Sequence, residues 1–170
     1  MRTGRSGEQT SFLLAASENR ALHLRIFAAV LVGVAALSPL SAAPVDAVRM
    51  RVAGFRDLGA SFKSLNDALR RGDANPAAMA QATRRIRELS RAQYAWFPKG
   101  SGPASGTKTA ARPEIWTDPA KFKSAQDAFA AQALALDTAA SSADKTNIQS
   151  QARRLGATCK ACHDSFRNED

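Results

Sequence analysis

The sequence predicts an all-α protein, a left-handed, up-and-down, antiparallel four-helix bundle, on three observations. Apolar residues recur at steps of three and four from Val45 almost to the end of the chain. No segment shows sustained alternation of polar and apolar residues, and β-branched residues are few. Two short links and one longer loop separate four periodic segments, so neighbouring helices should run antiparallel, and a seam repeat of about 3.5 favours left-handed supercoiling.

The first helix is expected to begin at Val45 and to end at Gly72. Its apolar stripe is predicted at Val45, Val48, Val52, Phe55, Leu58, Phe62, Leu65 and Leu69. A second helix should follow Asn75 and Pro76, a capping residue and a first-turn proline. Its stripe is predicted at Met79, Thr83, Ile86, Leu89, Gln93 and Trp96.

Residues 98–113 are rich in glycine, proline, serine and threonine and are expected to form one long loop without a packed element. Asp118 and Pro119 then cap a third helix, with a predicted stripe at Phe122, Ala125, Phe129, Ala133 and Leu136. Ser141, Ser142 and Asp144 open a fourth, whose stripe is predicted at Ile148, Ala152, Leu155, Cys159, Cys162 and Phe166.

The N-terminal segment has the parts of a secretory signal. A polar, basic stretch precedes the apolar run Ile26–Leu37, and small residues follow at Ser41, Ala42 and Ala43. The run has 12 residues, fewer than the ~20 of a membrane-spanning helix. Residues 1–43 are therefore interpreted as a signal peptide and residues 44–170 as an exported, periplasmic domain without a membrane span in its mature form. An uncleaved anchor is the alternative.

The charge balance is basic, with a formal net charge of +9 from 24 Lys and Arg against 15 Asp and Glu. The basic residues are spread through the helical patterns, and no known nucleic-acid-binding motif accompanies them. We therefore expect a solvated basic surface and no nucleic-acid partner. An acidic redox partner protein remains open.

The chemistry is concentrated in Cys159-Lys-Ala-Cys162-His163. Two thiols three positions apart on a helix lie on one face, about one turn apart, and suit thioether links to the two vinyl groups of a haem. His163 is four positions after Cys159 and stays on that face, where an imidazole can bind the iron. The pattern predicts one covalently bound haem c.

Other interpretations of the motif are weaker. A structural zinc site needs four ligands of this kind, and the whole sequence has two Cys and two His. A thioredoxin-like pair belongs at a helix start after a strand, whereas this pair lies within a helical pattern near the end of the sequence. A disulfide across one helical turn would strain its geometry.

Together with these features, the sequence resembles the cytochrome c′ family, four-helix proteins with one haem and a C-terminal CxxCH motif. The resemblance runs from about Val45 to Arg167, and its most specific stretches are Ala111–Asp118 and Cys159–Asp164. It implies that Cys159 and Cys162 attach the haem and that His163 binds the iron.

The resemblance also implies roles for three further residues. Arg51 falls where the family has an arginine near a haem propionate; a solvated helix residue is the alternative. Phe55 matches the residue that covers the vacant distal face of the iron. Arg167 matches a basic residue on the proximal side, although an arginine near a helix C-terminus also suits the helix dipole.

Two departures from the family bear on function. Val52 replaces a frequent glutamine, which removes one hydrogen bond to the haem edge. Leu58 stands where low-spin relatives have a methionine ligand, and leucine cannot bind iron. After the leader only Met50 and Met79 remain, Met50 predicted to face away from the seam and Met79 to be core.

The expected function is therefore binding or buffering of nitric oxide and carbon monoxide at a five-coordinate, high-spin iron, with electron transfer also open. The alternative is a six-coordinate, low-spin electron carrier of the cytochrome c-556 type. No acid–base pair or nucleophile accompanies the motif, so we do not expect an enzyme. The resemblance also implies a homodimer.

Overall fold

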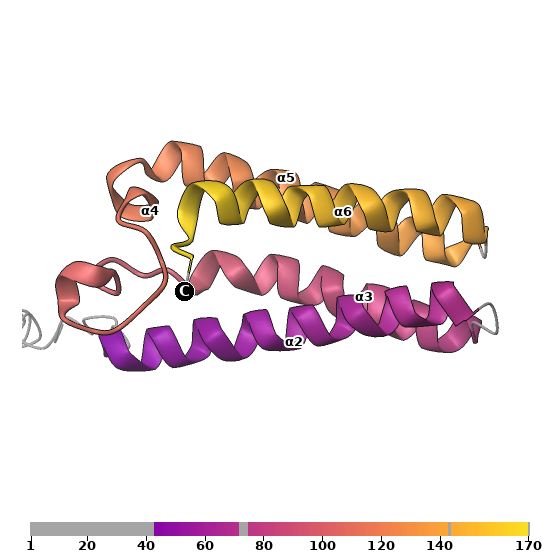
Figure 1. Cartoon of the computed structure of the whole chain (residues 1–170), viewed down its shortest axis with the longest axis horizontal. Coiled ribbons are helices and arrows are strands. Elements are labelled where there is room, and N and C mark those ends of the chain that lie inside the picture. Colours follow the sequence, from indigo (N-terminus) through magenta and orange to yellow (C-terminus); the bar gives the residue numbers. More distant parts are fainter. Residues whose placement is uncertain (1–42, 72–74, 143, 170) are drawn as a thin grey trace, which may run out of the picture. The chain divides into compact units, whose positions relative to one another are not determined.

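The computed structural model describes residues 43–71, 75–142 and 144–169. Four long helices dominate the described residues: α2 (Pro44–Arg71), α3 (Pro76–Ala92), α5 (Pro119–Ser141) and α6 (Lys145–Phe166). Between α3 and α5 lie the short 3₁₀ turns η1 (Gln93–Ala95) and η2 (Pro103–Ser105) and the single-turn helix α4 (Glu114–Thr117). Consecutive long helices run antiparallel (Figure 1), which confirms the predicted bundle.

The predicted helix starts are confirmed by their caps. Asn75 Oδ1 accepts a hydrogen bond from the N–H of Ala77 at 2.9 Å, and Pro76 is the first residue of α3. Asp118 accepts from the N–H of Lys121 at the start of α5. Asp144 accepts from two N–H groups in the first turn of α6. Each carboxylate or amide thus replaces a backbone acceptor that the first helical turn lacks.

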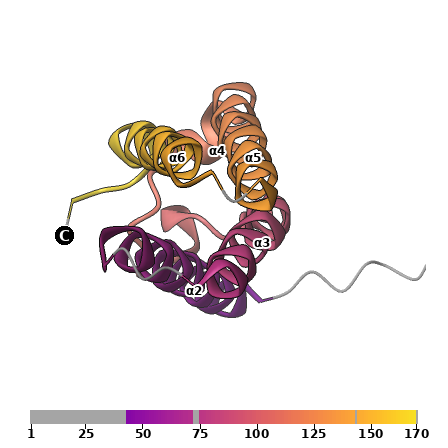
Figure 2. The same ribbon diagram turned by 90° about the vertical axis from the view of Figure 1, so that its right-hand side faces the viewer.

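The bundle has two different ends. The last turns of α2 and α5 and the first turns of α3 and α6 lie at one end, whereas the long connection 93–118 and the end of α6 lie at the other (Figure 1). Along the bundle α2 packs on α3, α3 on α5 and α5 on α6, and α2 and α6, the fourth neighbouring pair, have far less contact than these three pairs. Figure 2 shows the four helices arranged around the bundle axis. The CxxCH motif and the first turns of α2 are therefore at the end that carries the long connection.

The core consists of two clusters of buried side chains. The larger follows the bundle axis, and its most fully buried large apolar side chains are Leu65, Ile86, Leu136, Ile148 and Leu155. The smaller lies at the loop end and consists of Ala111, Ile115, Phe122 and Phe166. Cys159 packs against the first cluster and Cys162 against the second. The motif therefore lies at the junction of the two.

The stripe predicted for the first half of α2 is wrong. Val45 and Val52 are 43% and 41% exposed, whereas Ala47 and Arg51 are buried. The buried face runs from Ala47 through Arg51 to Leu58 and so includes a charged residue. An apolar pattern cannot reveal this face, because its central member is buried through hydrogen bonds that only the folded loop supplies.

The long connection is also more packed than predicted. Ser101 in its centre is 1% exposed, and η2 and α4 interrupt it with short helical turns. Near the end of this connection its backbone pairs with the end of α6. Arg112 N–H donates to the carbonyl of Phe166 at 3.0 Å, and Asn168 N–H donates to the carbonyl of Ala110 at 2.8 Å. The segment 98–113 therefore stays a loop, but one that is fixed in place.

The predicted signal peptide lies outside the described residues apart from Ala43. Within the described part of the chain, no helix has the length and apolar character needed to span a membrane.

Candidate haem site

Cys159 and Cys162 lie on the last two turns of α6, and both are free, half-buried thiols. Burial raises the pKa of the Cys159 thiol. Burial and the neighbouring Cys159 raise the pKa of Cys162 to about 11. Both thiols are therefore protonated and uncharged at neutral pH. That state suits a position next to apolar clusters and a final state as uncharged thioethers.

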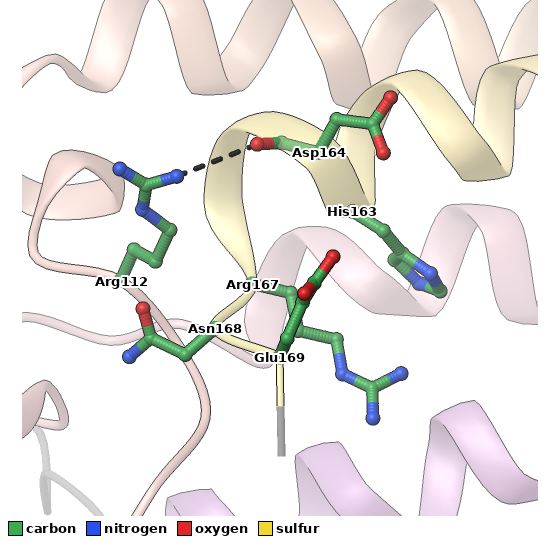
Figure 3. Close-up of a pocket in the computed structure, with 6 residues that line it drawn as sticks. All are labelled: Arg112, His163, Asp164, Arg167, Asn168 and Glu169. Carbon is green, nitrogen blue, oxygen red and sulfur yellow. Dashed lines mark hydrogen bonds between the residues drawn. The ribbon is translucent and has the colours of Figure 1, made fainter.

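His163 lies next to Cys162 at the edge of a cavity of about 640 Å³, lined by Arg112, His163, Asp164, Arg167, Asn168 and Glu169. Figure 3 shows the imidazole and the Arg167 guanidinium on one side of α6 and the Asp164 carboxylate on the other. Burial and the charge of Arg167 lower the pKa of His163, and Asp164 opposes them. The imidazole is therefore neutral at pH 7, the form that binds metals.

The end of α6 is held from two sides. The N–H of Arg167 donates to the carbonyl of His163 at 3.0 Å, and the chain then pairs with the segment around Ala111. The Arg112 side chain donates to the carbonyl of Asp164 at 3.4 Å (Figure 3). These bonds fix the backbone that carries the imidazole.

Arg51 points into the protein and is 4% exposed. Its Nε donates to the carbonyl of Trp96 at 3.2 Å, and one terminal nitrogen donates to Oγ1 of Thr109 at 3.2 Å. The other terminal nitrogen donates to the carbonyl and Oγ of Ser101, at 3.1 and 2.9 Å. The guanidinium carbon lies 4.4 Å from the centre of the Phe97 ring. The alternative of a solvated helix residue is therefore wrong.

Burial lowers the pKa of Arg51 to about 10, so the group still carries its charge at neutral pH. Four of its five N–H donors are used by the connection between α3 and α4. One N–H remains for a haem propionate. The expected propionate contact stays a prediction, and the contacts with the connection are an additional role that the sequence did not reveal.

Phe55 is half-buried on α2, one turn after Arg51. Its ring meets Trp96 edge-on, with centroids 4.9 Å apart, and Phe97 at 6.1 Å. Phe97 also contacts Phe122 at 4.8 Å. These rings form an apolar wall between α2 and the smaller core cluster. Of these rings, the sequence predicts a place in the site only for Phe55. Phe55 and its partners Trp96 and Phe97 are about 40 positions apart, and such a pairing leaves no local sequence pattern.

The residues described here fit a covalent haem. Two thiols on one helical face, a neutral imidazole beside them and an aromatic wall that begins with Phe55 on α2 are the groups that such a cofactor needs. Of the neighbouring pairs of long helices, α2 and α6 have the least contact, and they carry Phe55 and the motif. No three His, Cys, Asp or Glu in the described ranges gather as a direct metal site.

Comparisons with known proteins agree with this site. The family profile described as Cytochrome C′ matches residues 46–167. A cytochrome c′ of Alcaligenes xylosoxydans xylosoxydans is 33% identical over 129 residues, which cover 75% of this chain and 98% of that protein. The solved nitric oxide complex of a cytochrome c prime variant from Alcaligenes xylosoxidans has a TM-score of 0.68 and 31% identity, over 76% of this chain and 98% of that one. A carbon monoxide-bound variant from the same organism also has a TM-score of 0.68, with 32% identity over 75% and 98% of the two chains.

Arg51→Met tests the structural role of the buried guanidinium. Methionine keeps the apolar stem but leaves the Trp96 and Ser101 carbonyls without a donor, so we expect a loss of about 2–4 kcal/mol in unfolding free energy. Guanidinium chloride denaturation of the haem protein measures it. Arg49→Met, a change at an exposed position of the same helix, is the control and should stay within about 0.5 kcal/mol. Equal effects of the two substitutions would contradict the assignment.

Proposed function

The chain belongs to the cytochrome c′ family, whose cofactor is one covalently bound haem c with its iron, and from this premise we propose that it is an exported, gas-binding haem protein. When bound, the haem would supply an iron able to take up nitric oxide or carbon monoxide at a position that no protein side chain fills. Cys159 and Cys162 would hold the haem by thioethers, and His163 would bind the iron on its proximal side.

The observation that carries the proposal is the placement of the two methionines among the described residues, the side chains that could supply a second axial sulfur ligand. Met50 is 43% exposed on α2, and Met79 is a core residue in the first turn of α3, at the far end of the bundle from the motif. Leu58, at the position where low-spin relatives have a methionine ligand, is a buried aliphatic side chain that cannot bind iron. A five-coordinate, high-spin iron is the expected consequence.

The aromatic wall favours some gases over others. Bound dioxygen acquires negative charge and needs a hydrogen-bond donor, whereas nitric oxide and carbon monoxide depend on one much less. The rings of Phe55 and Phe97 offer no such donor. The solved relatives named above are nitric oxide and carbon monoxide complexes, which supports the same ligand class here.

Two further parts of the proposal follow from the family and the surface. Electron exchange with a redox partner protein is compatible with this site, whereas catalysis is not proposed, because no acid–base pair accompanies the motif among the described residues. A homodimer is proposed as the assembly, supported by exposed Val45, Met50 and Val52 on α2. Sedimentation equilibrium of the haem protein tests the dimer, and a monomer at all micromolar concentrations would contradict it.

Covalent attachment is tested by acid–acetone extraction. The colour should stay with the polypeptide, and Cys159→Ser and Cys162→Ser should each lose one thioether, visible by mass spectrometry. The double substitution should yield little stable protein, because an empty haem site leaves an apolar void. Pigment that partitions into the solvent would contradict the attachment.

The open sixth position is tested by visible spectra. Ferrous protein should have a broad Soret band without a sharp α/β pair and should bind carbon monoxide and nitric oxide. Phe55→Ala should raise the carbon monoxide affinity roughly 10-fold or more, because displacing a phenyl in a packed bundle costs free energy. The stability loss should be smaller than the about 3–5 kcal/mol of a fully buried Phe, since Phe55 is only half-buried.

Leu58→Met is the converse change. It offers a thioether where low-spin relatives carry theirs, so the ferrous spectrum should move toward low spin and gas binding should slow. Leu65→Met, at a buried position two turns further along the same helix, is the control and should leave the spectrum unchanged. A wild-type ferrous protein that is already low-spin and indifferent to carbon monoxide would favour the electron-carrier alternative.

Export is tested by cell fractionation and N-terminal sequencing. The mature protein should begin near Ala43 or Pro44 and should be recovered with the periplasm. Haem protein found intact and only in the membrane fraction would favour an uncleaved anchor.

A further inference from the structure

Trp96 is a large buried side chain to which neither the motif nor the family resemblance assigns a role. It follows η1 directly and is 5% exposed. Its indole reaches across to α2, where it fills the space that Gly54 leaves open. A Cβ atom at Gly54 would lie 2.3 Å from two indole carbons, Cζ2 and Cη2. Glycine in a helix is destabilising relative to alanine. At position 54 it is required by packing, because any larger residue would collide with the indole.

The contact is specific to one of the two glycines of α2. A Cβ atom at Gly59, on the same helix, would meet no atom within 4 Å. Gly54 therefore differs from Gly59 by the indole that lies against it. This difference provides a matched pair of positions for an experiment.

Trp96 is held in place through its backbone and through its ring. Its carbonyl accepts from Nε of Arg51 at 3.2 Å. Its ring meets Phe55 edge-on, with centroids 4.9 Å apart and the planes at 82°. Since Arg51, Gly54 and Phe55 are spaced three and four positions apart on one face of α2, the indole is packed against the same short stretch of the helix that carries the Phe55 ring.

We propose that Trp96, seated against Gly54, is a positioning residue that supports the Phe55 ring and thereby controls how readily a diatomic gas reaches the haem iron. The inference rests on the proposed function, in which Phe55 covers the gas-binding side. A phenyl that must move aside needs free volume behind it. The buried indole closes one of those directions, so removing its bulk should make the ring easier to displace.

Trp96→Leu in the haem protein tests the proposal, with carbon monoxide association measured by flash photolysis of the ferrous protein. We expect the association rate to rise roughly 3- to 10-fold. Trp116→Leu is the control, because that indole is paired with Phe97 at 6.3 Å rather than with Phe55, and it should change the rate less than 2-fold. An unchanged rate in Trp96→Leu would overturn the proposal.

A double-substitution cycle separates support of Phe55 from a general loosening of the fold. If Trp96 acts through the phenyl, Trp96→Leu should have no further effect on the association rate in the Phe55→Ala background. The same relative increase in both backgrounds would overturn the positioning role.

The glycine pair gives a readout that does not depend on gas binding. Gly54→Ala should displace the indole, change the near-ultraviolet circular dichroism of the aromatic residues and lower the denaturation midpoint, whereas Gly59→Ala should do neither. Identical behaviour of the two variants would show that the indole is not seated against Gly54. A wild-type protein that takes up no carbon monoxide would instead overturn the proposed function, while the dichroism and denaturation data would still decide whether Gly54 seats Trp96.

Discussion

The buried charge of Arg51 is the constraint on which the site end of the bundle depends. A guanidinium that is 4% exposed needs fixed acceptors, because an unpaired charge in a protein interior is strongly destabilising. The acceptors come from Trp96, Ser101 and Thr109, which span most of the connection after α3. The connection therefore cannot leave its place on α2 without removing the acceptors of that charge. In this way one side chain of the first helix fixes a segment about 50 residues later.

The other side of the site is fixed by different means. The end of α6 is paired through its backbone with the segment around Ala111. In addition, the Phe122 ring contacts Phe97 in the connection and Phe166 at the end of α6. The connection thus contacts α2 on one side and α6 on the other. Two helices that pack loosely on each other are in this way held at a defined separation by the segment between them. A flat cofactor attached to α6 needs such a fixed separation.

The sequence was a good guide wherever the signal is local. Asn75, Asp118 and Asp144 were predicted as caps because capping needs only a side-chain oxygen and the next turn. The motif at Cys159 and His163 was equally readable, because its spacing is that of one helical turn. The inward position of Arg51 was not readable as such, because its acceptors are supplied by residues 45 to 58 positions away. Gly54 likewise looks like any helical glycine until Trp96 is seen beside it.

The same packing explains how one wall can serve two purposes. The phenyl rings of Phe55 and Phe97 carry no hydrogen-bond donor and give the proposed gas site its low polarity, while the edge-on packing of Phe55 against Trp96 restricts the movement of the Phe55 ring. A wall of flexible aliphatic side chains would be equally apolar, but it would restrict the Phe55 ring less. The choice among gases and the ease with which a gas reaches the iron would then depend on different residues. Because Trp96 is anchored to α2 through both Arg51 and Gly54, the two properties are tied to one helical turn. Substitutions of Arg51 or Gly54 on that turn can therefore change the proposed gas access while the phenyl rings of Phe55 and Phe97, which carry no donor, are kept.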